Sequence, residues 1–158
     1  MMNGGETGVA QAVQRLEELV GYNLRRASAL MMSDFSAMFA DTFVRPTSFS
    51  VACIIDEQPG ITSAEICRIL GLQRANIVTL LAELEAANAI RRVDDADDKR
   101  IQRLYMSESG KENLLTWRQM AGHHEDRVLK RLTAGERAQL MELLNKIWRG
   151  PQNDDAGG

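Results

Sequence analysis

The sequence is poor in aromatic residues and in cysteine. Phenylalanine, tryptophan and tyrosine make up 5% of the 158 residues, so aliphatic side chains and methionine must fill the interior. This composition favours helices over a large sheet. The two cysteines, Cys53 and Cys67, each lie in an apolar periodic segment, which is typical of buried reduced thiols. The sequence therefore predicts a domain that folds without disulfides, metals or other cofactors.

Long apolar runs and an excess of positive charge are also missing. No run approaches membrane-spanning length, and the first residues lack the basic and apolar regions of a signal peptide, so we expect a cytoplasmic protein. The 19 Lys and Arg residues against 22 Asp and Glu residues give a net charge of −3. This charge argues mildly against a nucleic-acid binder, unless the basic residues cluster on one surface.

Motifs for catalysis or metal binding are absent from the sequence as well. It contains no phosphate-binding glycine loop, nucleophile elbow or paired catalytic acids. His123 and His124 are adjacent, and consecutive helical residues point about 100° apart, so the pair lacks the spacing of a zinc site. We therefore expect neither an enzyme nor a metal centre.

Apolar residues spaced three and four positions apart predict a long first helix. This stripe runs over residues 13–39, with a kink near Gly21, and Arg45-Pro46 is expected to end it. Thr47 or Ser48 is the candidate cap of a second helix that reaches about residue 56. Residues 1–8 and 150–158 are rich in glycine and asparagine or aspartate, and we expect both ends to be disordered.

A helix-turn-helix pattern with a wing follows. Thr62 to Glu65 fits a capping box, the helix that it starts should end at Gly71, and apolar periodicity over residues 77–84 marks a longer helix. Asn88 is a candidate for a left-handed helix cap. Residues 90–93 and 101–106 then read as two strands joined by a polar tip, which is a β-hairpin in the position of a wing.

The last third returns to helix, with Ser107 and Thr133 as candidate caps. The apolar stripe over residues 140–148 is larger than a chain of this size can bury alone, so we expect a two-fold homodimer. The predicted fold class is mainly α with a small β wing. Residues 46–107 form a winged helix-turn-helix DNA-binding region, and the N- and C-terminal helices, at 9–45 and 108–149, form a helical dimerisation region.

Several local strings resemble the MarR (multiple-antibiotic-resistance regulator) family. Asp98-Lys99-Arg100, followed by Leu104, Ser107 and Gly110, is similar to the wing pattern of that family, although serine replaces its usual threonine. The stretch 71–85 resembles its recognition helix, and 132–136 resembles the entry to its last helix. The resemblance implies a homodimer on a pseudo-palindromic operator, usually repressing transcription and often releasing DNA when a small molecule binds.

Candidate DNA-binding residues lie at the start of the second helix of the motif and on the wing. Amide side chains pair with adenine and arginine pairs with guanine, so Gln73, Arg74 and Asn76 suit base readout in the major groove. Thr79 is a further candidate DNA-binding residue. The resemblance implies basic residues at positions 79 and 83, where this chain has threonine and glutamate, so fewer phosphate contacts are expected from this helix. The alternative is that these residues only form an ordinary solvent-exposed start of a helix.

On the wing, Arg100 is the strongest candidate, because an arginine on a hairpin tip can enter the minor groove. The family pattern implies that Asp98 holds its guanidinium in a bidentate pair. Phosphate contacts are expected from a further set of residues, Arg91, Arg92, Lys99 and Arg103. Alternatively, these are solvated hairpin charges balanced by the aspartates of the tip.

A ligand pocket is a weaker prediction. Soft thioether and aromatic surface, which accepts flat apolar ligands, gathers near the first two helices at Met31, Met32, Phe35, Phe39, Phe43 and Phe49. Arg45, His123 or His124 would meet an anionic group, so the hypothesis is an aromatic acid or a conjugate such as a thioester. The alternative, that the aromatic residues form core and the charges lie on the surface, is favoured.

Two other functions stay open at this point. Cys53 or Cys67 would sense oxidants if either formed an exposed, stabilised thiolate, for which Arg68 beside Cys67 is the one local cation. The low pI instead allows a winged-helix module that binds proteins without binding DNA.

Overall fold

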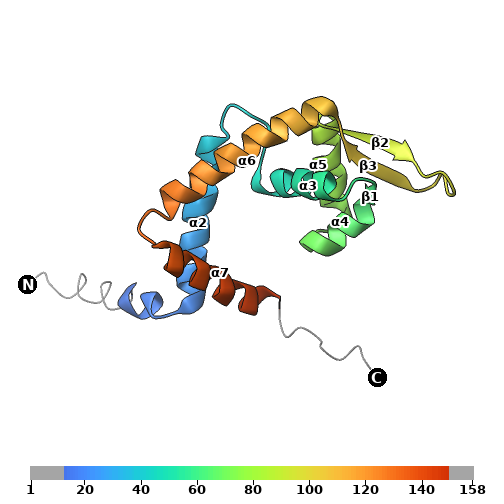
Figure 1. Ribbon diagram of the computed structural model, residues 1–158. Helices are drawn as coiled ribbons and strands as arrows, with labels where there is room; N and C mark the ends of the chain where they lie inside the picture. Colours follow the sequence, from blue (N-terminus) through green and yellow to red (C-terminus); the bar gives the residue numbers. More distant parts are fainter. Residues whose placement is uncertain (1–12, 150–158) are drawn as a thin grey trace, which may run out of the picture.

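The computed structural model describes residues 13–149, so the two ends expected to be disordered lie outside the described residues. Residues 13–17 are helical. The elements that follow are α2 (Val20–Met38), α3 (Pro46–Glu57), β1 (Ile61–Thr62), α4 (Ser63–Leu70), α5 (Arg74–Ala86), β2 (Ile90–Asp94), β3 (Gln102–Met106), α6 (Glu108–Val128) and α7 (Ala134–Trp148) (Figure 1). The mainly helical fold with a small antiparallel sheet confirms the predicted fold class.

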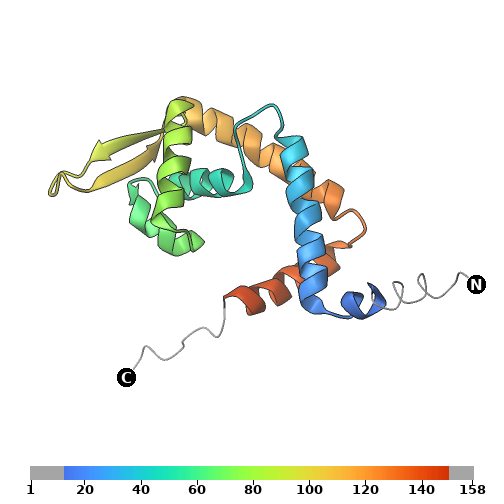
Figure 2. The same cartoon turned by 180° about the vertical axis from the view of Figure 1, so that it is seen from behind.

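The elements from α3 to β3, with the start of α6, form a winged-helix lobe with its own core. The sheet has the order β1-β3-β2, and the hairpin of β2 and β3 projects from the lobe (Figures 1 and 2). Ile61 of β1 pairs with Leu104 of β3. The core residues of the lobe are apolar and buried: Val51, Ala52, Ile55, Ile66, Ile77, Leu81, Leu84, Leu104 and Met106.

Local signals place the turns of this lobe. The Thr62 hydroxyl accepts the Glu65 amide, and the Glu65 carboxylate accepts the Thr62 amide at 2.8 Å, as expected for a capping box. The helix ends at Gly71, whose φ of 63° is left-handed. Asn88 has a φ of 54° and ends the turn after α5. These three predicted boundaries are confirmed.

The start of α6 packs tightly against the turn that follows α5. The Ser107 hydroxyl accepts the Gly110 amide at 2.8 Å and caps the helix. Gly110 packs so closely against the turn before β2 that a Cβ built on it would lie 1.8 Å from the Ala89 carbonyl oxygen. Only glycine fits at this contact, which explains why a glycine stands three residues after the cap.

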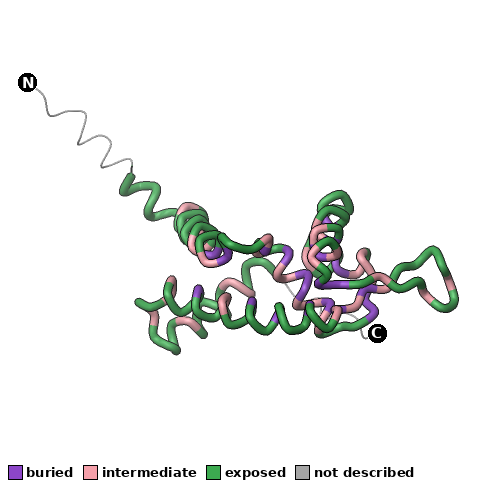
Figure 3. Tube along the Cα trace, turned by 90° about the horizontal axis from the view of Figure 1, so that it is seen from above, coloured by how far each residue is buried: buried purple, intermediate pink, exposed green. Residues whose placement is uncertain are grey.

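The terminal helices are far less buried than the lobe. α6 packs along α2, whereas no residue of α7 is buried, and α7 lies away from the winged-helix lobe (Figures 1 and 3). Large apolar side chains on these helices face solvent, among them Val20, Leu30, Met141, Leu143, Ile147 and Trp148. Taken alone, one chain therefore leaves an apolar surface uncovered.

The predicted boundaries of the first helix are wrong, whereas the second helix ends at Glu57, close to the predicted residue 56. The first helix breaks at Glu18-Leu19 and not near Gly21. The Asn23 side-chain amide donates across the break to the Glu17 carbonyl at 2.7 Å and to the Leu19 carbonyl at 2.9 Å. α2 ends at Met38, several residues before Arg45-Pro46.

The cap of α3 also differs from the prediction. Arg45 is the N-cap and Pro46 the first helical residue, a position where the missing amide of proline costs nothing. The Ser48 hydroxyl accepts the Arg45 amide at 2.8 Å, so Ser48 lies inside the helix and not at its cap.

The short strand β1 was not predicted, because two residues carry no periodicity. Within residues 13–149, no helix is long and apolar enough to cross a bilayer.

Candidate nucleic-acid interface

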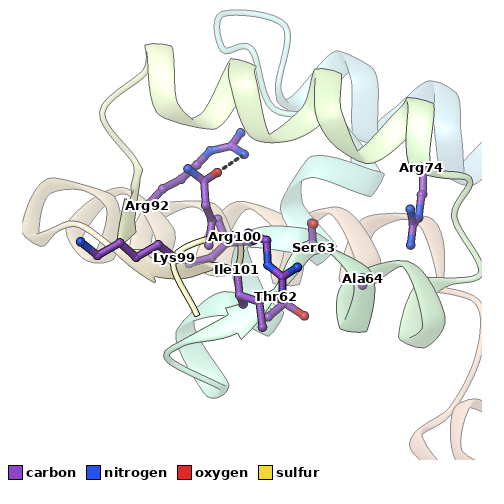
Figure 4. A pocket seen from close by; sticks show the side chains of 10 residues that line it. Thr62, Ser63, Ala64, Arg74, Arg92, Lys99, Arg100 and Ile101 are labelled. Carbon is purple, nitrogen blue, oxygen red and sulfur yellow. Dashed lines mark hydrogen bonds between the residues drawn. The ribbon is translucent and has the colours of Figure 1, made fainter. Parts of the chain in front are cut away.

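A cationic groove separates the wing from the helix-turn-helix. It has a volume of about 540 Å³ and lies between the hairpin tip, the start of α4 and the start of α5 (Figure 4). Four basic side chains line it: Arg74, Arg92, Lys99 and Arg100. Basic residues therefore do cluster on one surface of this acidic chain, as a nucleic-acid binder requires.

The wing tip is organised around two aspartates. Asp98 accepts Arg100 through two parallel bonds, from Nε to Oδ1 at 2.9 Å and from Nη2 to Oδ2 at 2.8 Å. Asp95 accepts the backbone amides of Asp97 and Asp98 and so closes the turn. The bonds from Arg100 lower the pKa of Asp98, and 90% of the Arg100 side chain is exposed. An exposed guanidinium is thus held in one orientation.

The two faces of the hairpin carry different arginines. Arg91 pairs with Tyr105 in the sheet, and its guanidinium lies 4.8 Å from the centre of the Tyr105 ring. Arg103 is on the same face, where it binds Asp95 and donates to the Gly60 carbonyl at 3.0 Å. Both therefore lie away from the groove, since side chains alternate along a strand.

Arg92 is on the face of the hairpin that lines the groove. Its Nε donates to Glu85 of α5 at 2.7 Å. This pair ties the wing to α5. Of the five basic wing residues that the sequence predicts, the structure thus brings Arg92, Lys99 and Arg100 together and separates Arg91 and Arg103 from them.

The predicted residues of α5 lie on different sides of the helix. Gln73 is the N-cap and is exposed, and Arg74 lines the groove. Asn76 and Thr79 line a second hollow of about 330 Å³, between α5 and the start of α3. Arg45 lines the same hollow, 3.6 Å from Glu83. The structure therefore does not place Arg45 in the aromatic pocket in which it was predicted to bind an anion.

The aromatic residues of the predicted pocket pack on one another. The rings of Phe35 and Phe39 are stacked at 4.3 Å and both residues are buried, while Phe49 lies 6.2 Å from Phe35. Phe43 instead contacts Trp117 edge-on at 5.6 Å. Met31 is half-buried and Met32 exposed. This packing supports the core interpretation of the cluster.

His124 is the one predicted anion-binding residue that borders this cluster, since His123 is exposed. His124 is buried against Phe35, and its Nδ1 lies 2.7 Å from Asp34 Oδ2. Arg127 binds the other oxygen of Asp34 at 2.8 Å, and Arg127 and His124 together lower the pKa of that carboxyl. A carboxylate of the protein thus already occupies the position next to His124.

The cysteines have the surroundings of structural thiols. Both are half-buried, and burial raises the pKa of the Cys53 thiol. A raised pKa lowers the thiolate fraction, which counts against oxidant sensing at Cys53. In the described part of the chain, no group of histidine, cysteine and acidic side chains could hold a metal ion.

Sequence reasoning missed two contributions to the interface. Thr62 and Ser63, at the start of α4, line the groove and present a helix N-terminus to it. The capping box located this helix start, but nothing in the sequence placed it against the wing. The exposed apolar side of α5, with Val78, was also missed because only polar residues were considered for readout.

This geometry defines a class of protein, the winged-helix DNA-binding fold. Comparison with known proteins agrees: a family model described as MarR family matches residues 44–101. The structure of the transcriptional repressor CouR bound to a 23-mer DNA duplex is 32% identical, with a TM-score of 0.79, over 84% of this chain and 94% of that chain. The chain belongs to the MarR family of transcriptional regulators.

Two further relatives are more distant. The putative transcriptional regulatory protein for the hcr operon of Thauera aromatica is 25% identical over 82% of this chain and 79% of its own. The transcriptional repressor Rv2887 of Mycobacterium tuberculosis is 25% identical over 81% of this chain and 92% of its own. A structure of Rv2887 with p-aminosalicylic acid has a TM-score of 0.65 at 24% identity, over 81% of this chain and 97% of that chain. These relatives are transcriptional regulators and not enzymes.

Proposed function

We propose that this protein is a transcriptional repressor that binds a pseudo-palindromic operator as a homodimer and is released by a small aromatic acid or a related conjugate such as a thioester. The observation that carries the proposal is the groove between wing and helix-turn-helix, where Arg100 is held in a bidentate pair by Asp98. A pre-oriented arginine loses little entropy on entering the minor groove. The similarity to CouR, whose structure contains a DNA duplex, also supports DNA binding by this chain.

The residues of the groove divide by role. Arg74, at the start of α5, faces base edges, and Lys99 and Arg92 contact phosphates beside the Arg100 contact. Gln73 and Asn76 add base contacts at the helix start, with Thr79 beside them. Arg91 and Arg103 stabilise the hairpin through Tyr105 and Asp95 instead of contacting DNA.

Dimerisation follows from the terminal helices. Their exposed apolar side chains need a cover, and a second copy supplies the same surface across a two-fold axis. Such a dimer presents two α5 helices and two wings, which is what a palindromic site requires. On this proposal, residues 46–107 bind DNA and the helices on either side of them form the dimer.

The proposed effector site lies where α2, α3 and α6 meet. Its support is the aromatic acid bound by the Rv2887 relative, together with Phe43, Phe49 and half-buried Met31 at the border of the aromatic cluster. The His124–Asp34 pair would have to open for His124 to meet an acid. A panel of aromatic acids and their thioesters, titrated against the protein–DNA complex, tests this part. Unchanged DNA affinity across the panel removes the effector from the proposal.

Substitution of the wing arginine tests the DNA-binding part. Arg100→Ala should weaken binding to a selected operator duplex by roughly 1–3 kcal/mol, because it removes the oriented minor-groove contact. The matched control is Arg131→Ala, an exposed arginine in the turn between α6 and α7, which should bind as wild type does. Fluorescence anisotropy at several salt concentrations measures both. Equal affinities of Arg100→Ala and wild type would remove the wing from the interface.

The competing function is a winged-helix module that binds protein. A steep fall of affinity with salt and a preference for one palindrome favour the repressor. A chain that shows neither property with any duplex from a random library would favour the protein-binding module.

A further inference from the structure

The solvent side of α5 is apolar, which is unusual for a helix on a protein surface. Its buried side consists of Ile77, Leu81 and Leu84. The opposite side carries the exposed residues Ala75, Val78, Thr79, Ala82 and Ala86, which we call the alanine–valine strip. Their spacing of three and four positions places them along one side of the helix. Val78 is 63% exposed, and it is the largest side chain of the strip.

Polar and charged side chains border the strip on both sides. Arg74 and Asn76 are two positions apart, roughly 200° around a helix, so they flank the strip and do not share a face. Arg74 leads into the cationic groove with Lys99 and Arg100, and Asn76 leads into the hollow that contains Arg45.

The acidic residues of α5 are each paired with an arginine from outside the helix. Glu83 lies 3.6 Å from Arg45, and Glu85 accepts Arg92 at 2.7 Å. Both glutamates lie beside the strip and not on it. The solvent side of α5 is therefore an uncharged strip, with the cationic groove at one edge and the Arg45–Glu83 pair at the other.

We infer that the alanine–valine strip reads 5-methyl groups of pyrimidines in the major groove, so that thymine methyls specify the operator half-site; this inference rests on the proposed function. The thymine methyl is the apolar feature of base-pair edges, and alanine, threonine and similar apolar groups recognise it by contact. Most of the strip carries no donor or acceptor with which to pair with a base edge. The cationic groove at one edge of the strip and the exposed Arg45 side chain at the other suit contacts to the phosphates that flank a groove of DNA.

The small size of the strip residues supports DNA over a protein partner. Protein interfaces are centred on large anchors such as tryptophan, tyrosine and arginine, whereas the strip offers three alanines, a threonine and a valine. Alanine at 75 and 82 lets the helix backbone approach the base edges closely. Val78, the largest apolar side chain of the strip, then makes the main methyl contact, near Arg74.

The test uses a duplex that the full-length protein itself selects from a random library. Each thymine of the duplex is replaced in turn by uracil, which lacks the 5-methyl group and keeps every hydrogen-bonding group. At the contacted thymines of each half-site, affinity should fall about three- to five-fold per methyl, the loss expected for one buried methyl-sized group. Replacing a contacted thymine–adenine pair by 5-methylcytosine–guanine should retain more affinity than replacing it by cytosine–guanine.

Two matched variants assign the readout to the strip. In Val78→Ala, at least one of these uracil effects should shrink to less than two-fold, because the side chain that covers the methyl is gone. In Ile69→Ala, which removes a 50% exposed apolar side chain from α4 outside the strip, every uracil effect should persist. Both sites are exposed, so neither variant is expected to lose its fold, and circular dichroism checks this.

The outcomes separate this inference from the proposed function. Sequence-specific, salt-dependent binding that is indifferent to uracil at every position overturns the methyl readout and leaves the repressor intact. Uracil effects of equal size in wild type and Val78→Ala also overturn the assignment to the strip. The absence of sequence-specific binding to any duplex overturns both, and a protein captured by the strip instead would identify the competing module.

Discussion

In the winged-helix lobe, α3, α5 and β3 each bury apolar side chains, whereas no residue of α7 is buried. The two regions use the same local devices: Thr62 with Glu65 starts α4, and Thr133 with Glu136 starts α7, each through a capping box. The difference arises from packing and not from helix propensity. A single chain thus buries the core of its winged-helix lobe and leaves apolar side chains of α7 exposed.

The largest expected effect comes from placing charge on the uncovered stripe. Leu143→Glu with Ile147→Glu puts two carboxylates on the exposed apolar side of α7, which should separate the dimer. Losing the second half-site contact should weaken operator binding by roughly 100-fold or more, since linked sites gain factors of that size. Analytical ultracentrifugation and anisotropy measure the two effects.

Lys146→Glu is the matched control for that double variant, because it changes the net charge by the same amount on the polar side of α7, where Lys146 pairs with Glu142 at 2.6 Å. It should remain dimeric. A double variant that stays dimeric and binds as wild type does would show that α7 is not part of the dimer surface.

The next effect compares two glycines of α6. Gly110→Ala should destabilise the fold by roughly 2–4 kcal/mol, because the new Cβ would lie 1.8 Å from the Ala89 carbonyl oxygen and force the backbone apart. Gly122→Ala meets nothing within 4 Å and should be neutral or stabilising by about 0.5–1 kcal/mol. Urea unfolding measures both. Equal costs would mean that α6 does not lie against Ala89 as described.

The smallest effect separates the two capping boxes. Thr62→Ala should lower the free energy of unfolding by about 1 kcal/mol, because α4 is packed into the lobe. Thr133→Ala should fray α7 with little change in unfolding of the lobe, since no residue of α7 is buried. Hydrogen exchange resolved by residue distinguishes the two results. Equal destabilisation of the lobe by both would contradict the difference between the regions.

The same boxes predict a pH dependence. Hydrogen bonds from Thr62 lower the pKa of Glu65, and those from Thr133 lower the pKa of Glu136. A lowered pKa means that the contribution is complete above the ordinary pKa, near 4.5, and is lost as the pH falls through the folded value. The wild type should therefore lose more stability on acidification from pH 6 to pH 3 than Glu65→Gln, which cannot titrate at this position, as measured by urea unfolding. Parallel losses would remove Glu65 from the acid response.

Much of the fold could be read from the sequence because its boundaries depend on local chemistry. The capping boxes, the left-handed Gly71 and Asn88, and the change to strand periodicity each involve neighbours along the chain. The break before α2 and the short strand β1 could not be read in this way. The first depends on the Asn23 side chain and the second on pairing with β3, more than 40 residues away.

The candidate site shows the same limit. The Asp98–Arg100 pair is local and was expected from the resemblance, whereas Arg103 binds the Gly60 carbonyl across the fold. Arg91 and Arg92 are adjacent on a strand. Because successive side chains of a strand point to opposite faces of the sheet, the sequence alone could predict that the two arginines face opposite sides. The position of Arg45 beside Glu83 could not be predicted in this way, because it depends on how α3 packs against α5.

In the proposed complex, two protomers present two α5 helices and two wings to one side of a duplex. Hydroxyl-radical footprinting of the full-length protein on its selected operator examines this arrangement. We expect two symmetric protected regions one helical turn apart, about 34 Å, on the same side of the duplex, with loss of the flanking minor-groove protection in Arg100→Ala. A single protected region, or protection unchanged in Arg100→Ala, would contradict it.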